Sequence, residues 1–300
     1  MRASSAPCRI APGFLRTRGE CGPGNRSCQA SVRVCVAAGC ETVEPVATTT
    51  LLKLLLAPTL IMLATLAGRR WGPAVGGWLA GLPLTSAPVS LILALEHGPD
   101  FAARAALGTL FGLISLAAFS LAYGIAARRL QWVACLAAAL SAFGISTLAF
   151  EGVTLPLAVA FALVCAVLAA VGAAMAGSGP PRPPPRLVAG DLAIRMAIAA
   201  LLVLALTSVA GALGPALAGS LSPIPVFGAL LAVFAHRDQG AAAAVALLRG
   251  MVLGSFGFAA FMMMVSGLLD RAAIAPTYAL ASAGALGIHG VTLALVRRSA

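Results

Sequence analysis

From about residue 48 to its end, the chain alternates apolar stretches with short breaks that carry Arg, Asp, Glu or Pro. A helix needs about 20 apolar residues to cross a hydrocarbon core of about 30 Å. In lipid, a spanning segment must also satisfy its own backbone hydrogen bonds. We therefore predict an all-α fold, a polytopic bundle of transmembrane helices. The nine expected spans lie near residues 50–68, 74–95, 103–127, 131–150, 153–176, 191–212, 215–235, 244–268 and 273–295.

The composition excludes several other classes of protein. Hydrophobic residues make up 60% of the 300 positions and charged residues 10%, whereas a typical globular chain has about 25% charged residues. An ordinary soluble domain, a disordered chain and a nucleic-acid-binding domain are all excluded on this ground. The net charge of +11 comes mainly from Arg at the ends of the apolar stretches, which is a topology signal in a membrane protein. The expected partner is the lipid bilayer, and no nucleic acid.

Residues 1–46 differ from the rest of the chain. They hold six Arg and five of the seven cysteines, with no CxxC pair and no His. A zinc site therefore has little support, and we predict neither a metal nor a cofactor. An Arg-rich, acid-poor start can indicate a transit peptide. We interpret residues 1–46 instead as a disordered tail or as the result of a start codon placed too early.

The positions of the Arg residues predict an orientation. With nine spans, one side of the membrane receives the acidic breaks at Glu96 to Asp100, Glu151 and Asp270. The positive-inside rule places the opposite, Arg-bearing side in the cytoplasm. The expected location is a bacterial inner membrane, with the C-terminus in the cytoplasm. The Arg residues of the cytoplasmic side are Arg69, Arg70, Arg128, Arg129, Arg182, Arg186, Arg237, Arg297 and Arg298.

An internal repeat is the strongest pattern in the sequence. A shift of 142 residues aligns Gly72-Pro73 with Gly214-Pro215, Pro83 with Pro225 and Gly98 with Gly240. Such self-similarity at a fixed offset indicates duplicated structure. We divide the body into a first repeat (47–150), a connector helix with a Pro-rich cytoplasmic linker (151–190) and a second repeat (191–300).

The offset between the two repeats amounts to five spans, which is an odd number. The halves are therefore expected to cross the membrane in opposite directions, as two inverted four-helix repeats joined by a central helix. This architecture occurs in many secondary transporters, because two similar halves can exchange conformations. Repeats also occur in scaffolds and channels, where the duplication serves stability alone.

Helix-breaking residues interrupt the second span and the equivalent seventh span. Paired interruptions of this kind point to a substrate site near the membrane midplane, because the carbonyls that proline frees need new partners. The alternative is a kink that serves packing, with Ser and Thr bonded back to their own helix. The candidate substrate-binding residues are Gly81, Pro83, Thr85, Ser86, Pro88, Ser220, Ser222, Pro223 and Pro225.

Two equivalent turns place a carboxylate near a histidine at a helix end. The first has Glu96 and His97, and the second has His236 and Asp238. Such a pair can exchange protons near neutral pH, so these four residues are candidates for proton coupling. A carboxylate at the end of a span can equally be a solvated loop residue.

The remaining polar residues have simpler interpretations. We expect Lys53 and Arg195 to extend their side chains toward the membrane interface, and Arg249 to lie at the cytoplasmic interface. His289, inside the ninth span, is interpreted as a packing residue. The patterns Gly108-x3-Gly112 and Gly250-x3-Gly254 predict close helix contacts within the chain.

The stretch from Arg69 to Gly108, with its core GLPLTS, resembles a stretch that recurs in multi-spanning bacterial inner-membrane proteins of uncharacterised function. The plan is also similar in outline to drug/metabolite exporters with five-plus-five inverted halves, although a tenth span and that family's side-chain signatures are missing. The resemblance implies no activity. The chain also has no HExxH, GxSxG or P-loop motif, so we predict no enzyme. The favoured function is secondary transport of a small solute, and the alternative is a non-catalytic membrane subunit or scaffold of a larger complex.

Overall fold

The computed structural model describes residues 32–36, 39–43, 59, 61–83, 86–153, 155–177, 183, 194–198, 200–201 and 226–298. The chain divides into two compact units, residues 1–52 and residues 53–300. In the first unit, strand β1 (Val32–Val36) pairs antiparallel with β2 (Gly39–Val43), and Cys35 is opposite Cys40. This hairpin was not expected from the sequence. Alternating valines in β1 and the Thr42-Val43 end of β2 favour it, because β-branched residues suit a pleated strand.

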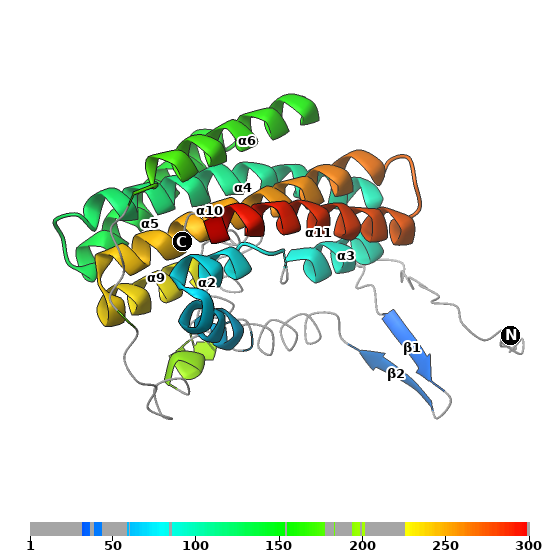
Figure 1. The fold of residues 1–300 in the computed structure, drawn as a ribbon. Helices are drawn as coiled ribbons and strands as arrows, with labels where there is room; N and C mark the ends of the chain where they lie inside the picture. Colours follow the sequence, from blue (N-terminus) through cyan, green and yellow to red (C-terminus); the bar gives the residue numbers. More distant parts are fainter. Residues whose placement is uncertain are drawn as a thin grey trace, which may run out of the picture. The chain divides into compact units, whose positions relative to one another are not determined.

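The described part of the second unit is built of helices joined by short turns (Figure 1). Residues 61–71 and 194–198 are helical. The other helices are α2 (Pro73–Ala80), α3 (Ser86–His97), α4 (Pro99–Ala126), α5 (Trp132–Phe150), α6 (Leu157–Ala174), α9 (Val226–Gln239), α10 (Ala241–Leu268) and α11 (Ile274–Arg298).

Five of the described helices are long and apolar enough to cross a membrane, namely α4, α5, α6, α10 and α11. The described part of this unit is thus helical, and its long apolar helices agree with the expected class, a helical membrane protein. The count of nine spans stays a prediction, since most of the expected spans 50–68, 191–212 and 215–235 lies outside the described residues. The expected span 74–95 is divided between α2 and α3.

Two glycines with positive φ make the sharp turns before the longest helices. Gly98 has φ 89° before α4, and Gly240 has φ 90° before α10. Only glycine adopts such a backbone conformation without a steric cost. A turn of one residue then suffices to reverse the chain between α3 and α4 and between α9 and α10.

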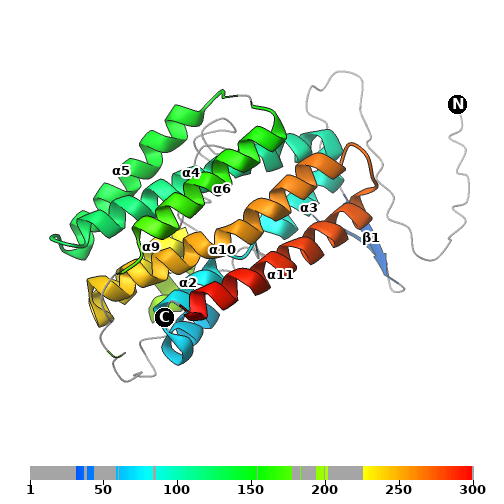
Figure 2. The same ribbon diagram turned by 45° about the horizontal axis from the view of Figure 1, so that its top comes forward.

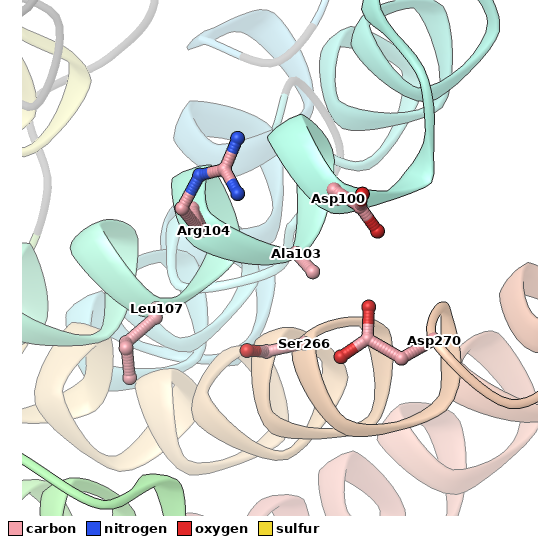
Figure 3. Close-up of a pocket in the computed structure, with 6 residues that line it drawn as sticks. All are labelled: Asp100, Ala103, Arg104, Leu107, Ser266 and Asp270. Carbon is pink, nitrogen blue, oxygen red and sulfur yellow. The ribbon is translucent and has the colours of Figure 1, made fainter.

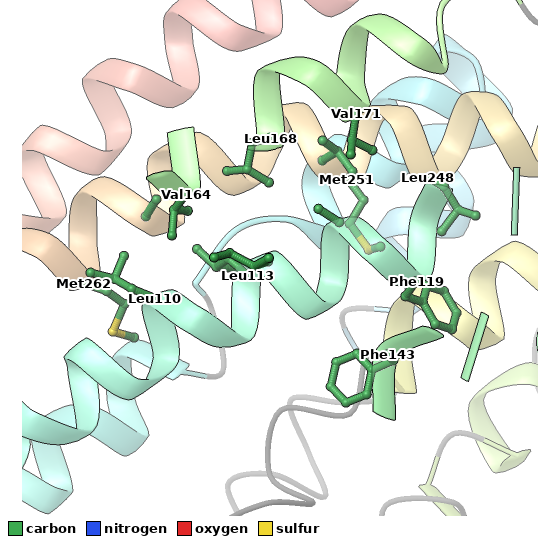
Figure 4. Packing of buried hydrophobic residues seen from close by; sticks show 14 of the residues in the cluster. Leu110, Leu113, Phe119, Phe143, Val164, Leu168, Val171, Leu248, Met251 and Met262 are labelled. Atoms are coloured by element: carbon green, nitrogen blue, oxygen red, sulfur yellow. The ribbon is translucent and has the colours of Figure 1, made fainter. Parts of the chain in front are cut away.

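Helix α10 is the centre of the packing. It contacts α2, α4, α6, α9 and α11, and Figure 2 shows it between α4 and α6 on one side and α11 on the other. The side chains between these helices are almost entirely apolar (Figure 4). Leu110, Val164, Leu168, Leu248 and Val252, for example, are fully buried. Since lipid is as apolar as these side chains, shape complementarity holds such helices together.

Glycines bring α2 and α10 unusually close together. A Cβ atom at Gly77 would lie 1.7 Å from the carbonyl oxygen of Leu247, and one at Gly250 would lie 1.9 Å from the carbonyl oxygen of Ala74. At Gly254 the nearest atom would be the Trp78 oxygen, at 2.5 Å. The predicted close contact at Gly250-x3-Gly254 is therefore confirmed, and it lies within the chain.

Helices α4 and α10 run in opposite directions. Residues from the start of α4 and from the end of α10 line one cavity, among them Asp100 and Ser266. At the other end, the Tyr123 hydroxyl in the last turn of α4 lies 3.1 Å from Nδ1 of His236, just before α10 begins. The start of each helix thus lies beside the end of the other.

Candidate functional site

The predicted interruption of the second span is present in the structure. Helix α2 ends at Ala80, Gly81 to Pro83 are not helical, and α3 begins at Ser86. The Pro83 carbonyl accepts the amide hydrogen of Ala87 at 2.8 Å, and the Leu79 carbonyl accepts that of Leu82 at 3.2 Å. Local hydrogen bonds therefore satisfy part of the freed backbone, as a chain in lipid requires. Thr85 lies outside the described residues.

Packing accounts for Gly81. A Cβ atom there would lie 2.6 Å from the Met251 oxygen and 3.0 Å from Cα of Gly254. Gly81 is buried, and the backbone of α10 fills the space beside it. The structure thus gives the packing interpretation direct support at this residue, whereas the neighbouring Pro83, Ser86 and Pro88 are half-buried.

One polar contact ties the broken span to α11. The buried Ser90 hydroxyl lies 2.7 Å from the hydroxyl of Tyr278. The sequence marks Ser90 as a polar group of the span, but nothing in the pattern indicates Tyr278 as its partner. The candidate residues of the seventh span, Ser220, Ser222, Pro223 and Pro225, lie outside the described residues, so a pairing of the two breaks stays a prediction.

The turn between α3 and α4 opens toward a cavity, which we name the Asp100 cavity. It has a volume of about 280 Å³ and lies between the start of α4 and the end of α10. The carboxylates of Asp100 and Asp270 extend into the same space in Figure 3. The sequence predicts these two acidic breaks on one side of the membrane, and the antiparallel helices do bring them to one end. The lining residues are Asp100, Ala103, Arg104, Leu107, Ser266 and Asp270.

The electrostatics of this cavity suit a wet, solvent-facing mouth. Asp100 lies in the first turn of α4, where the helix dipole favours a negative charge. Asp100, Arg104 and Asp270 are all exposed. Of the predicted coupling residues here, Glu96 is half-buried, and the His97 ring stacks on Phe101 with 4.9 Å between ring centroids.

The equivalent turn between α9 and α10 is closed by side-chain contacts, which we name the Asp238 cluster. Asp238 forms an ion pair with Arg195, and His236 bonds the Tyr123 hydroxyl. Arg237 lies over the Trp132 ring at 5.7 Å. The cluster thus joins α9 to α4, to α5 and to the helical segment 194–198. Its members are Tyr123, Trp132, Arg195, Phe234, His236, Arg237 and Asp238.

Arg195 is more enclosed than the sequence indicates. The residue is 5% exposed, and its guanidinium lies 4.2 Å from the Phe234 ring centroid and pairs with Asp238 near the end of α9. The ion pair with Asp238 and the aromatic face offset the cost of burying the charge. The repeat gave a signal for this contact, because the same offset relates Lys53 to Arg195 and Glu96 to Asp238. Tyr123 and Trp132 carried no such signal.

No group of three or more His, Cys, Asp or Glu residues that could hold a metal ion occurs within the described ranges. Comparison of the chain with protein-family models, with curated proteins and with solved structures finds no match. The resemblance of the GLPLTS stretch to bacterial inner-membrane proteins therefore stays a prediction.

Proposed function

We propose that the chain is a secondary transporter that moves a small solute across a bacterial inner membrane by alternating access. It does no chemistry on the solute, and its C-terminus lies in the cytoplasm. Two inverted repeats of four helices, joined by α6, form the transporter. The observation that carries this proposal is the antiparallel pair of α4 and α10, the longest helices of the two proposed repeats.

Recurring helix boundaries support the duplication. Helix α4 spans residues 99–126 and α10 spans 241–268, so both ends recur after 142 residues (241 minus 99). The same shift relates the last residue of α3, His97, to that of α9, Gln239. It also relates the first residue of α5, Trp132, to that of α11, Ile274. The offset found in the sequence therefore matches the boundaries of three helix pairs.

The contacts between helices also exchange between the two proposed halves. Helix α3 contacts α11, and its counterpart α9 contacts α5, the counterpart of α11. Helix α4 packs on α5 as α10 packs on α11. The connector α6 packs on both α4 and α10. This reciprocal pattern is what a pseudo-twofold axis in the membrane plane requires.

The two ends of the α4–α10 pair differ, as expected for one state of an alternating-access cycle. The Asp238 cluster closes one end with an ion pair and a hydrogen bond. The other end holds the Asp100 cavity, whose charged side chains are exposed. In an exchange between states, contacts at the closed end break while the open end closes. His236 and Asp238 are then gating or coupling residues. Glu96 and His97 lie in the equivalent turn, at the other end of the α4–α10 pair.

The proposed solute site lies beside the two span breaks. Ser86 and Pro88 flank the break between α2 and α3, with Pro83 and Thr85 before them, and Ser220, Ser222, Pro223 and Pro225 mark the equivalent segment. A purified protein can be screened for solutes that raise its melting temperature. Thr85→Val combined with Ser222→Ala should abolish uptake of such a solute into proteoliposomes without loss of folded protein. Wild-type uptake by that variant would remove these residues from the site.

Single-cysteine labelling tests the inverted repeat directly. In a cysteine-free background, His97→Cys and Gln239→Cys place one thiol at the end of each equivalent helix. A membrane-impermeant maleimide should label position 97 from outside and position 239 only from the cytoplasmic side. Labelling of both positions from one side would show that the halves are parallel, and the membrane-subunit alternative would then be preferred.

A further inference from the structure

A buried histidine lies where the broken span meets the second half of the molecule. His289 of α11 is 2% exposed. Its ring lies edge-to-face with Trp78 of α2, with 5.6 Å between the centroids and 89° between the planes. On the α10 side, a Cβ atom at Gly257 would lie 2.4 Å from Nε2 of His289. The ring therefore occupies a space that a glycine leaves for it, between α2, α10 and α11.

Within the part of the chain that the structure describes, neither ring nitrogen of His289 has a hydrogen-bond partner. A neutral imidazole carries one donor and one acceptor, and each buried group left unsatisfied costs about 1–3 kcal/mol. Packing alone does not explain such a residue, because an apolar side chain of similar size would avoid this cost. Ionisable residues within a membrane span generally mark paths of ions or protons.

Trp78 is an aromatic neighbour of His289. Its ring centroid lies 5.6 Å from that of His289, within the distance of about 6 Å at which the face of an aromatic ring can stabilise a cation. The Trp78 indole is held in place, since Nε1 donates to the Thr292 hydroxyl at 3.0 Å and that hydroxyl donates to the His289 carbonyl at 3.1 Å. The contact with the aromatic ring is thus fixed by α11 itself.

Along α2, α10 and α11, the described ionisable residues are about two turns or more from the ring. Helix α2 has no ionisable residue. On α10 the closest ionisable residue along the helix is Arg249, about two turns before Gly257. On α11 the nearest are Tyr278, about three turns before His289, and Arg297, about two turns after it. A proton that reaches this ring would therefore be the dominant charge at the site.

We propose that His289 is a proton-binding site, at which the free ring nitrogen takes a proton from water and becomes an imidazolium held against Trp78. The proposal rests on the proposed transport function, for which it names the coupling ion. Trp78 lies one turn before the break, and its carbonyl accepts the amide hydrogen of Gly81 at 3.1 Å. The new charge would therefore act directly on the helix that leads into the interrupted segment.

Tryptophan fluorescence tests this without a known solute. The chain has three tryptophans, so Trp71→Phe with Trp132→Phe leaves Trp78 as the only reporter. An imidazolium quenches a neighbouring indole, so emission should fall as the pH is lowered from about 8 to about 4. The fall should disappear in His289→Gln and persist in the matched variant His97→Gln. Emission that does not change with pH, or quenching that survives His289→Gln, would overturn the proposal.

A second measurement needs no substitution at the site. The chain has three histidines, so His97→Gln with His236→Gln leaves His289 alone for ¹³C and ¹⁵N labelling. In nanodiscs its ring signals should move from the neutral to the protonated positions as the pH falls. Signals that stay neutral would contradict the site even where His289→Gln fails to fold. Transport is assayed separately, on the chain with all three histidines. Titration of His289 without transport by that chain would support the proton site and contradict the transporter, and transport without titration would do the reverse.

Discussion

At the residue scale, two equivalent glycines have different surroundings. Gly250 on α10 faces the α2 backbone, with the Ala74 oxygen 1.9 Å from the position of an added Cβ. Its counterpart in the repeat, Gly108 on α4, is exposed and has no described atom within 4 Å of such a Cβ. Among the described residues, the two glycines thus have different neighbours, which permits a matched experiment.

We predict that Gly250→Ala is strongly destabilising and that Gly108→Ala is not. The added methyl group at position 250 has to push α2 from α10, and such overpacking costs about 1–3 kcal/mol or more. At the exposed position, alanine gains up to about 1 kcal/mol from its helix propensity. Melting temperatures of the two purified variants check this. A Gly250→Ala variant that melts at the same temperature as the unsubstituted chain would mean that the close approach of α2 to α10 is absent in the protein.

The Arg195–Asp238 ion pair gives a second prediction at this scale. Asp238→Asn leaves a buried guanidinium without its counter-charge, and loss of one partner of a buried pair costs about 3–5 kcal/mol. Replacing both partners with apolar residues, as in Arg195→Met with Asp238→Leu, should recover most of that loss. Denaturation in detergent measures the free energies. Asp270→Asn, at an exposed position just after α10, is the control, and a loss of stability in Asp238→Asn no larger than in that control would contradict the assigned pairing.

At the scale of the elements, the sequence predicts where helices begin and end far better than how they contact each other. The expected spans 131–150 and 273–295 lie within three residues of the observed ends of α5 (Trp132–Phe150) and α11 (Ile274–Arg298). Helix ends are set locally, by turn glycines such as Gly98 and by charged breaks. The Ser90–Tyr278 bond joins residues far apart in the chain, and no periodic pattern encodes such a pair.

The candidate site shows the same limit. The interruption at Gly81 to Pro83 followed from residue types alone, because glycine and proline break helices wherever they cluster. That Gly81 faces α10, and that Arg195 reaches Asp238, depends on which helix faces pack together. The repeat was the one long-range signal in the sequence. It related equivalent positions, and it pointed to a contact only for Arg195 and Asp238, whose counterparts Lys53 and Glu96 also carry opposite charges.

The antiparallel pair of α4 and α10 makes a prediction at this scale. A double variant Asp100→Cys with Asp270→Cys places thiols on two residues that line the same cavity, and a short bismaleimide should link them. The control Asp100→Cys with Ala242→Cys places thiols at the starts of both helices. Each helix is 28 residues long, or about 42 Å at 1.5 Å per residue, so a short linker should not join the control pair. Peptide mapping of the product identifies the link, and a linked control pair would show parallel helices.

At the scale of the whole molecule, the proposed transport cycle depends on a balance between a state closed at one end and a state closed at the other. The described structure closes the end that holds the Asp238 cluster, through contacts to Tyr123, Trp132 and Arg195. These contacts have no counterpart among the charged residues of the Asp100 cavity, whose side chains are exposed. Weakening the Asp238 cluster should therefore shift the population toward the state that is open at the Asp238 end and closed at the Asp100 end. Only interactions that differ between the two states move such a balance.

Labelling of a thiol beside the broken span can report this shift. In a cysteine-free background, Ser86→Cys should react with an impermeant maleimide mainly from the side of the Asp100 cavity. Adding Tyr123→Phe and Asp238→Asn removes one hydrogen bond and one ion pair from the closed end. If these changes favour the opposite state by about 1.4 kcal/mol, the ratio of the two populations changes tenfold. Labelling from the Asp238 side should rise accordingly and labelling from the Asp100 side should fall.

The contrary result is a labelling rate that the two substitutions leave unchanged from both sides, in a protein that remains folded. The two ends would then not alternate, and a static membrane subunit would explain the bundle better.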